Sequence, residues 1–136
     1  IVVMGGNNAK LKKRLRTVFA DAPEVSVLDF TREIPLYMDA CDLLFTKPGG
    51  LTSTEAAVKN IPLIHTNPIP GCETMNAKFF SERGMSIYET SVSKQVDGAL
   101  QLLGSEEKKA DMLRAQQTGI PTDAGERICD LIMQNL

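Results

Sequence analysis

The sequence predicts an α/β fold with a parallel sheet and helices on both of its faces. Short β-branched or apolar runs alternate along the chain with segments of helical periodicity, which is the pattern typical of parallel sheets. Ten glycines and seven prolines punctuate these segments at intervals and do not gather in one tract. The chain has 136 residues, 43% of them hydrophobic, so we expect a single domain over residues 1–136.

The first part of the chain is expected to contain three strands and two helices. Residues 1–4 are β-branched and apolar and end in a glycine-rich turn, which predicts a buried strand. Apolar residues then recur at helical spacing among basic ones, and Pro23 ends the predicted helix. Residues 25–30 and 42–46 are predicted strands, with a short helix over residues 33–38 between them.

The second part is expected to continue the alternation and then to become helical. A helix is predicted over residues 51–58, with Thr52 or Ser53 available as its N-cap. Gly84 is expected to end a later helix. The remaining elements are predicted strands over residues 62–66 and 85–88 and predicted helices over residues 75–83, 93–103, 106–117 and 123–136.

Composition argues against several classes of protein. No apolar run reaches the roughly 18 residues that span a bilayer, and the N-terminus lacks the features of a signal peptide. A formal net charge of −2 gives no overall positive field that would favour nucleic acid. The three cysteines are far apart and odd in number, which is typical of a reducing compartment, so we expect a cytoplasmic protein. Because the sequence starts at Ile1, inside an apolar run, we expect a piece of a longer protein.

Three predicted loops follow the carboxyl ends of strands, where open parallel sheets bind ligands. The first is the turn Gly5-Gly6-Asn7-Asn8, where the N-terminus of a helix can receive an anion. The turn lacks the spacing of dinucleotide-binding and P-loop motifs. A tight turn without a ligand is therefore an equally good interpretation of this segment.

The second loop, residues 46–55, joins two glycines to the start of a helix. Gly49 and Gly50 leave room for backbone amides to approach a ligand, and the positive end of the helix favours a diphosphate. Glu55 lies one turn into this helix, where its carboxylate can accept hydrogen bonds from the two hydroxyls of a ribose. The alternative is that Glu55 closes a capping box with Thr52.

The third loop leads from residue 68 into a helix and presents Glu73 and Asn76. These are hydrogen-bonding groups suited to a polyol, held in a segment whose shape two prolines and a glycine restrict. The alternative is a surface N-cap and a solvated carboxylate.

These motifs resemble a known family of enzymes. Residues 44–57 (LFTKPGGLTSTEAA), 61–63 (IPL), 70–76 (PGCETMN) and Gly84 are similar to the C-terminal, donor-binding domain of GT-B glycosyltransferases of family 28. Within that family the resemblance is to monogalactosyldiacylglycerol synthase and diacylglycerol glucosyltransferase, with the peptidoglycan lipid-intermediate N-acetylglucosaminyltransferase as a related enzyme. The resemblance implies a Rossmann-like sheet, the C-terminal half of a GT-B fold.

The resemblance also implies a UDP-sugar site and assigns its parts. The diphosphate is expected at the Gly49-Gly50 turn and the ribose at Glu55. The hydroxyls of the hexose are expected at Glu73, with support from Asn76. The uracil is expected near the loop after the second strand. The full set of expected donor-binding residues is Gly5, Gly6, Asn7, Phe30, Thr31, Arg32, Gly49, Gly50, Leu51, Thr52, Glu55, Glu73 and Asn76. Cys72 stands where galactolipid enzymes often carry glutamine, so the resemblance does not decide which sugar is transferred.

The family resemblance implies an inverting transfer of a hexose, glucose or galactose, to a lipid acceptor such as diacylglycerol. UDP-N-acetylglucosamine-dependent transfer is the alternative. Family members carry the general base and the acceptor and membrane contacts in an N-terminal domain, so we expect no catalytic residue, metal or cofactor here, and an isolated chain that binds donor without turnover. The parent enzyme is expected to associate peripherally with the inner face of the membrane.

Three further interpretations follow from the residues alone. The run from Lys10 to Arg16 carries five positive charges in seven residues and faces either solvent or anionic lipid. His65, the single histidine, lies in a predicted buried strand and is expected to have a packing role. A non-catalytic phosphate- or nucleotide-binding module remains the alternative from a different class, although Asp29 and Asp42 stand singly and form no phosphorylatable cluster.

Overall fold

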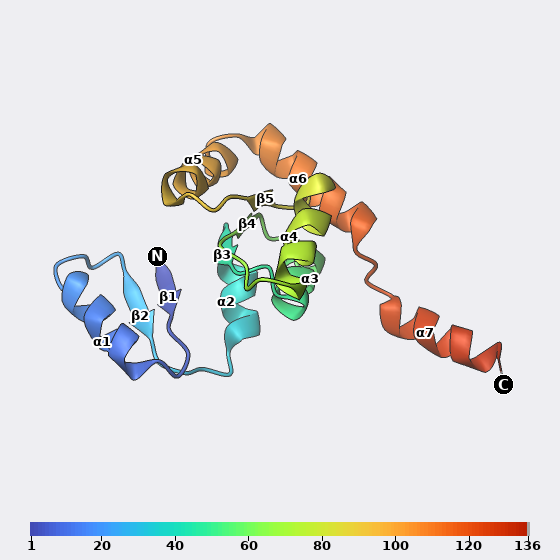
Figure 1. Cartoon of the computed structure of the whole chain (residues 1–136), viewed down its shortest axis with the longest axis horizontal. Helices are drawn as coiled ribbons and strands as arrows, with labels where there is room; N and C mark the ends of the chain where they lie inside the picture. Colours follow the sequence, from blue (N-terminus) through green and yellow to red (C-terminus); the bar gives the residue numbers. More distant parts are fainter. Residues whose placement is uncertain (136) are drawn as a thin grey trace. The chain divides into compact units, whose positions relative to one another are not determined.

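The computed structural model describes residues 1–135, and these form two compact units (Figure 1). The first unit covers Ile1–Tyr37 and the second begins at Met38. Helix α2 (Ile34–Ala40) carries the chain from one unit into the other. Every strand pairing in both units is parallel, so the predicted α/β class with parallel strands is confirmed.

The first unit is a β-α-β segment. Strands β1 (Val2–Met4) and β2 (Ser26–Leu28) pair in parallel, and helix α1 (Ala9–Val18) connects them. Gly6 makes the turn after β1 with a φ of 50°, a left-handed conformation that glycine adopts without a steric cost. Asn8 then caps α1, because its Oδ1 accepts a hydrogen bond of 3.0 Å from the amide of Leu11.

The second unit contains a three-stranded sheet in the order β3-β4-β5. The strands are β3 (Leu44–Thr46), β4 (Leu63–His65) and β5 (Ile87–Tyr88). The helices that follow α2 in this unit are α3 (Gly50–Val58), α4 (Cys72–Glu82), α5 (Val92–Leu103), α6 (Glu106–Gly119) and α7 (Ala124–Met133). No helix among residues 1–135 combines the length and the apolar character needed to cross a membrane.

Strand β4 lies at the centre of the core because its three residues are buried and alternate between two faces of the sheet. On one face Leu63 packs with Ala56 and Ala57 of α3 and with Phe80 of α4. On the other face, Ile64 packs in a second cluster whose members come from α5 and α6, namely Ala99, Leu102 and Met112. The prediction of helices on both faces is therefore confirmed for this sheet.

The structure differs from the prediction in the number of sheets and at several boundaries. The strands form two sheets instead of one; each strand has only two or three residues, so each pairing depends on few backbone hydrogen bonds. Helix α3 begins at Gly50, so Gly49 is its N-cap and the predicted caps Thr52 and Ser53 lie inside the helix. Helix α4 begins at Cys72, three residues before the predicted start. Helix α7 ends at Met133, before the predicted end at residue 136, which lies outside the described residues.

One glycine near the core has no room for a side chain. A Cβ atom on Gly119, the last residue of α6, would lie 2.6 Å from the Sδ atom of Met85, a side chain with no exposed surface. We expect Gly119→Ala to lower the free energy of unfolding by about 1–3 kcal/mol, because overpacking displaces core side chains. Gly125→Ala is the control, since a Cβ there meets nothing within 4 Å. Chemical denaturation checks this, and equal stability of the two variants would contradict it.

Candidate functional site

The turn between β3 and α3 presents free backbone amides. Gly49 caps the helix with an extended backbone (φ −72°, ψ 137°), and its own amide donates a 2.7 Å hydrogen bond to the carbonyl of Lys47. The first intrahelical bond runs from Ser53 N to Gly49 O at 3.0 Å. The amides of Gly50, Leu51 and Thr52 therefore open the helix without an intrahelical acceptor. This arrangement is suited to an anion.

Space in front of this turn is open. A Cβ atom on Gly49 would meet no heavy atom within 4 Å, and one on Gly50 would meet only the Nδ2 atom of Asn76, at 3.8 Å. Both glycines also have ordinary φ angles, since neither is among the residues with positive φ. The glycine pair is thus required neither by the backbone nor by packing, and what it leaves is accessible surface beside the helix N-terminus.

Two side chains of helix α4 form hydrogen bonds with the turn between β3 and α3. The Asn76 amide donates a 3.0 Å hydrogen bond to the carbonyl of Pro48, which is itself buried. Glu73 accepts through Oε2 from the amide of Ile69, and its Oε1 lies 3.1 Å from the ammonium of Lys47. The hydrogen bond from Ile69, assisted by Lys47, lowers the pKa of the Glu73 carboxyl. Glu73 and Asn76 therefore tie the loop before α4 to the turn before α3.

The structure contradicts the alternative that Glu73 is a solvated carboxylate and Asn76 an N-cap. The side chain of Glu73 is only 13% exposed and has partners at both oxygens, so it is not a solvated carboxylate. Asn76 is likewise not an N-cap, because Gly71 caps α4. In the described residues both side chains contact the protein, and a hexose at Glu73 would have to share its carboxylate with Lys47.

Glu55 is an exposed residue of α3. It is the sixth residue of the helix, and the cap at Gly49 uses no side chain, so the capping box between Thr52 and Glu55 is wrong. The carboxylate has no hydrogen-bond partner among residues 1–135. It is free to accept hydrogen bonds from a ligand.

Three buried side chains are connected by hydrogen bonds beneath the turn between β3 and α3. Ser53 of α3, His65 of β4 and Ser86 are all buried, and the imidazole joins the two hydroxyls through Nε2 at 2.9 Å and Nδ1 at 3.0 Å. The rings of Phe80 and His65 pack in a T-shaped arrangement, with centroids 5.4 Å apart. Burial lowers the pKa of His65 to about 4, so the ring is neutral at pH 7. His65 therefore has the packing role expected from the sequence.

The other predicted donor residues lie in the first unit. Gly5, Gly6 and Asn7 follow β1, while Phe30, Thr31 and Arg32 follow the adjacent strand β2. The exposed residues among these six are Gly6, Asn7, Phe30 and Arg32, and the side chain of Phe30 is 66% exposed. Thr31 Oγ1 accepts a 3.0 Å hydrogen bond from the amide of Glu33 just before α2. An exposed aromatic ring after β2 is compatible with stacking on a base.

Sequence reasoning missed two contributors to this site. Lys47 was seen only as part of the glycine-containing loop, and Ser53 only as a possible cap. Their partners Glu73 and His65 lie 26 and 12 residues away in the chain. A cation directly before Pro-Gly-Gly was the available signal for Lys47. Among residues 1–135, no three His, Cys, Asp or Glu side chains gather in a group that could hold a metal ion.

Comparison with known proteins identifies relatives of this chain. No protein-family model matches it. The processive diacylglycerol β-glucosyltransferase of Staphylococcus epidermidis is 34% identical over 107 residues, which are 79% of this chain and 27% of that enzyme. The enzyme of the same name from Staphylococcus carnosus is 33% identical over 117 residues, or 86% and 30% of the two chains. That of Staphylococcus aureus is 30% identical over 129 residues, or 95% and 33%.

The chain is a homologue of these diacylglycerol glucosyltransferases. The family resemblance expected from residues 44–57 and 70–76, to GT-B glycosyltransferases of family 28, is confirmed. The match between this chain and these curated relatives spans only 27% to 33% of the relatives' length.

The fold is also that of a solved structure. The crystal structure of MurG from Acinetobacter baumannii matches with a TM-score of 0.75 at 21% identity, over 98% of this chain and 41% of that one. The Rossmann-like GT-B fold implied by the sequence is therefore confirmed for this chain.

Proposed function

We propose that this chain is the UDP-sugar-binding domain of an inverting glycosyltransferase that transfers a hexose, glucose or galactose, to a lipid acceptor such as diacylglycerol. The observation that carries the proposal is its identity of 30% to 34% to processive diacylglycerol β-glucosyltransferases over 79% to 95% of its length. The free amides beside Gly49 and Gly50 support it, because they suit a diphosphate. Residues 1–136 are proposed to be one such domain of a longer enzyme.

In this proposal each group at the turn has a chemical role. The amides of Gly50, Leu51 and Thr52 bind the diphosphate and stabilise the negative charge that grows on UDP as it leaves the anomeric carbon. The carboxylate of Glu55 accepts from the ribose hydroxyls. Glu73, with Asn76, binds hydroxyls of the hexose and also holds Lys47 beside the turn.

The remaining donor contacts are proposed for the first unit. Phe30, Thr31 and Arg32 would contact the uracil, and Gly5, Gly6 and Asn7 would face the donor from the end of β1. The base that removes the acceptor's proton is proposed to lie outside these residues, in an N-terminal domain that also contacts the acceptor. We further propose a cytoplasmic enzyme that associates peripherally with the inner face of the membrane, because the relatives are named for a lipid substrate.

Calorimetric titration of the chain tests the donor site. We expect weak binding of UDP and of UDP-glucose or UDP-galactose, and weaker binding of inorganic phosphate. Gly49→Ala should reduce the affinity at least several-fold, since its Cβ would lie where the ligand is proposed to bind, and should lower the unfolding free energy by no more than about 1 kcal/mol, because alanine is a poorer N-cap than glycine. No binding of any UDP compound, or equal binding of other nucleoside diphosphates, would refute the proposal. A clear preference for UDP-N-acetylglucosamine would favour that sugar, and equal binding of phosphate would favour a phosphate-binding module.

A further inference from the structure

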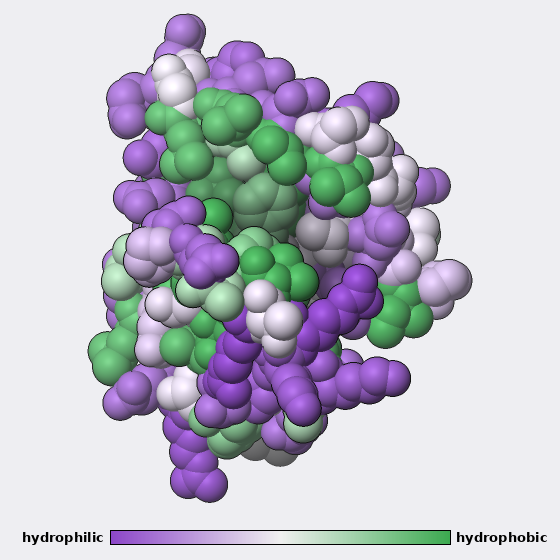
Figure 2. All heavy atoms as spheres, turned by 90° about the vertical axis from the view of Figure 1, so that its left-hand side faces the viewer, coloured by the Kyte–Doolittle hydropathy of each residue, from purple (hydrophilic) through white to green (hydrophobic). Residues whose placement is uncertain are grey.

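Positive charge is concentrated on α1 of the first unit. Half of the ten residues of α1 are Lys or Arg, and none is acidic. The first unit carries six Lys or Arg against four Asp or Glu, whereas the rest of the chain carries nine against thirteen. Lys10, Lys13 and Arg14 are exposed, and no carboxylate among residues 1–135 forms an ion pair with them. Figure 2 looks onto this helix and shows hydrophilic side chains gathered over it.

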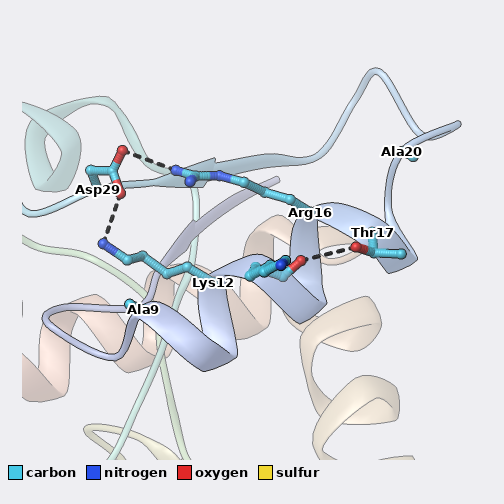
Figure 3. A pocket seen from close by; sticks show the side chains of 7 residues that line it. Ala9, Lys12, Arg16, Thr17, Ala20 and Asp29 are labelled. Atoms are coloured by element: carbon cyan, nitrogen blue, oxygen red, sulfur yellow. Dashed lines mark hydrogen bonds and ion pairs between the residues drawn. The ribbon is translucent and has the colours of Figure 1, made fainter.

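A groove of about 670 Å³ runs along the side of α1 opposite Leu11 and Val18 and is also basic. Its lining residues are Ala9, Lys12, Lys13, Arg16, Thr17, Ala20 and Asp29. Figure 3 shows Lys12 and Arg16 reaching from α1 to Asp29, at 2.7 and 3.1 Å. The hydrogen bond from Lys12, together with Arg16, lowers the pKa of Asp29, so this carboxylate stays charged and fixes both cations. The groove retains more positive than negative charge.

Apolar side chains are exposed on the same helix. Leu11 is 42% exposed and Val18 is 64% exposed, and a spacing of seven residues places them on one face. Arg14 lies between them, three residues after Leu11 and four before Val18, so that a cation flanks the apolar pair. Helices with a basic face and exposed apolar side chains lie at the interface of anionic bilayers.

We propose that the side of α1 that carries Lys10, Leu11, Arg14 and Val18 forms a contact surface for an anionic phospholipid bilayer, with lipid phosphates at Lys10, Arg14 and, at the edge of this side, Lys13. Leu11 and Val18 enter the headgroup region beside them. The choice of a lipid surface rests in part on the proposed function, whose acceptor is a lipid. Nucleic acid fits less well, because α1 contains no aromatic residue to stack on bases. The surface belongs to this chain and acts in addition to any contact made elsewhere in the parent enzyme.

Co-sedimentation of the chain with vesicles tests this proposal. We expect at least tenfold stronger binding to vesicles of phosphatidylcholine and phosphatidylglycerol (7:3) than to phosphatidylcholine alone, since each basic residue near an anionic surface contributes about fivefold. Lys10→Gln/Lys13→Gln/Arg14→Gln should remove most of this difference. The matched control, Lys78→Gln/Lys94→Gln/Lys108→Gln, removes the same charge from exposed sites in the second unit and should retain it. Raising the salt to 0.5 M should abolish binding of the unmodified chain.

Two further arms separate the sources of phosphate and the two proposals. Equal binding to neutral vesicles, equal loss in both triple variants, or tighter binding to a single-stranded oligonucleotide would overturn the proposal, as would full competition by millimolar inorganic phosphate. UDP titration of the α1 triple variant should match the unmodified chain, so a missing UDP site and a missing lipid surface are distinguished.

Discussion

Replacing Glu55 by alanine is expected to lower the affinity of the chain for UDP by roughly tenfold to hundredfold. The proposed role of Glu55 is to accept hydrogen bonds from the two ribose hydroxyls, and a hydrogen bond to a charged group is worth about 1.5–3 kcal/mol. The folded protein should not be weakened, because the side chain is exposed and takes no part in the helix cap. Alanine is also the best helix former at such a position.

The measurement is a titration with UDP at one salt concentration, paired with chemical denaturation of each variant. Glu55→Gln keeps two polar atoms without the charge and should lose less affinity than Glu55→Ala. Glu82→Ala removes the same charge from an exposed position at the end of α4, and should bind UDP as the unmodified chain does. If Glu55→Ala binds UDP as tightly as Glu82→Ala while the unmodified chain binds well, the ribose assignment is wrong although the nucleotide site itself remains.

The spacing of apolar residues and the positions of glycine and proline were enough to predict the helices and strands of this fold. Every predicted strand and helix is present, although the strand predicted to be buried at residues 1–4 is wrong in its burial, because Val2 and Met4 are exposed. The N-cap of α3 was mispredicted for a local reason. Side-chain preference favours Ser53 as a cap, but the structure uses its hydroxyl for His65 and leaves capping to the backbone of Gly49.

The contacts that shape the site could not be predicted from spacing. Glu73 and Lys47 meet because the loops after β3 and β4 follow adjacent parallel strands, and that adjacency is a property of the sheet. Asn76 reaches Pro48 across 28 residues for the same reason. The open space at Gly49, by contrast, is what the glycine pair implied. The exposure of Glu55 did not follow from the predicted register, because the helix begins at Gly50 and not after Thr52 or Ser53.

A second large effect is expected from the titration of His65. Burial lowers the pKa of its imidazole from 6.5 to about 4, so folding favours the neutral ring. As the pH falls, the unfolded chain binds this proton first, and stability is lost between pH 6.5 and about 4. At 1.36 kcal/mol for each pKa unit, the loss amounts to about 3 kcal/mol. Above pH 6.5 the contribution is fully present.

His65→Gln isolates this effect, because glutamine does not titrate and its amide can still bond with Ser53 or Ser86. We expect the unfolding free energy of the unmodified chain, minus that of the variant, to fall by about 3 kcal/mol between pH 7.5 and 4. Carboxylates that titrate over the same range, such as Glu73, contribute to both chains and cancel. UDP affinity at pH 7.5 should be retained in His65→Gln, since the ring lies beneath the turn and not on its surface. A difference in stability that does not change with pH would show that His65 titrates alike in the folded and unfolded chains, and loss of UDP binding in a stable variant would place the imidazole among the donor contacts.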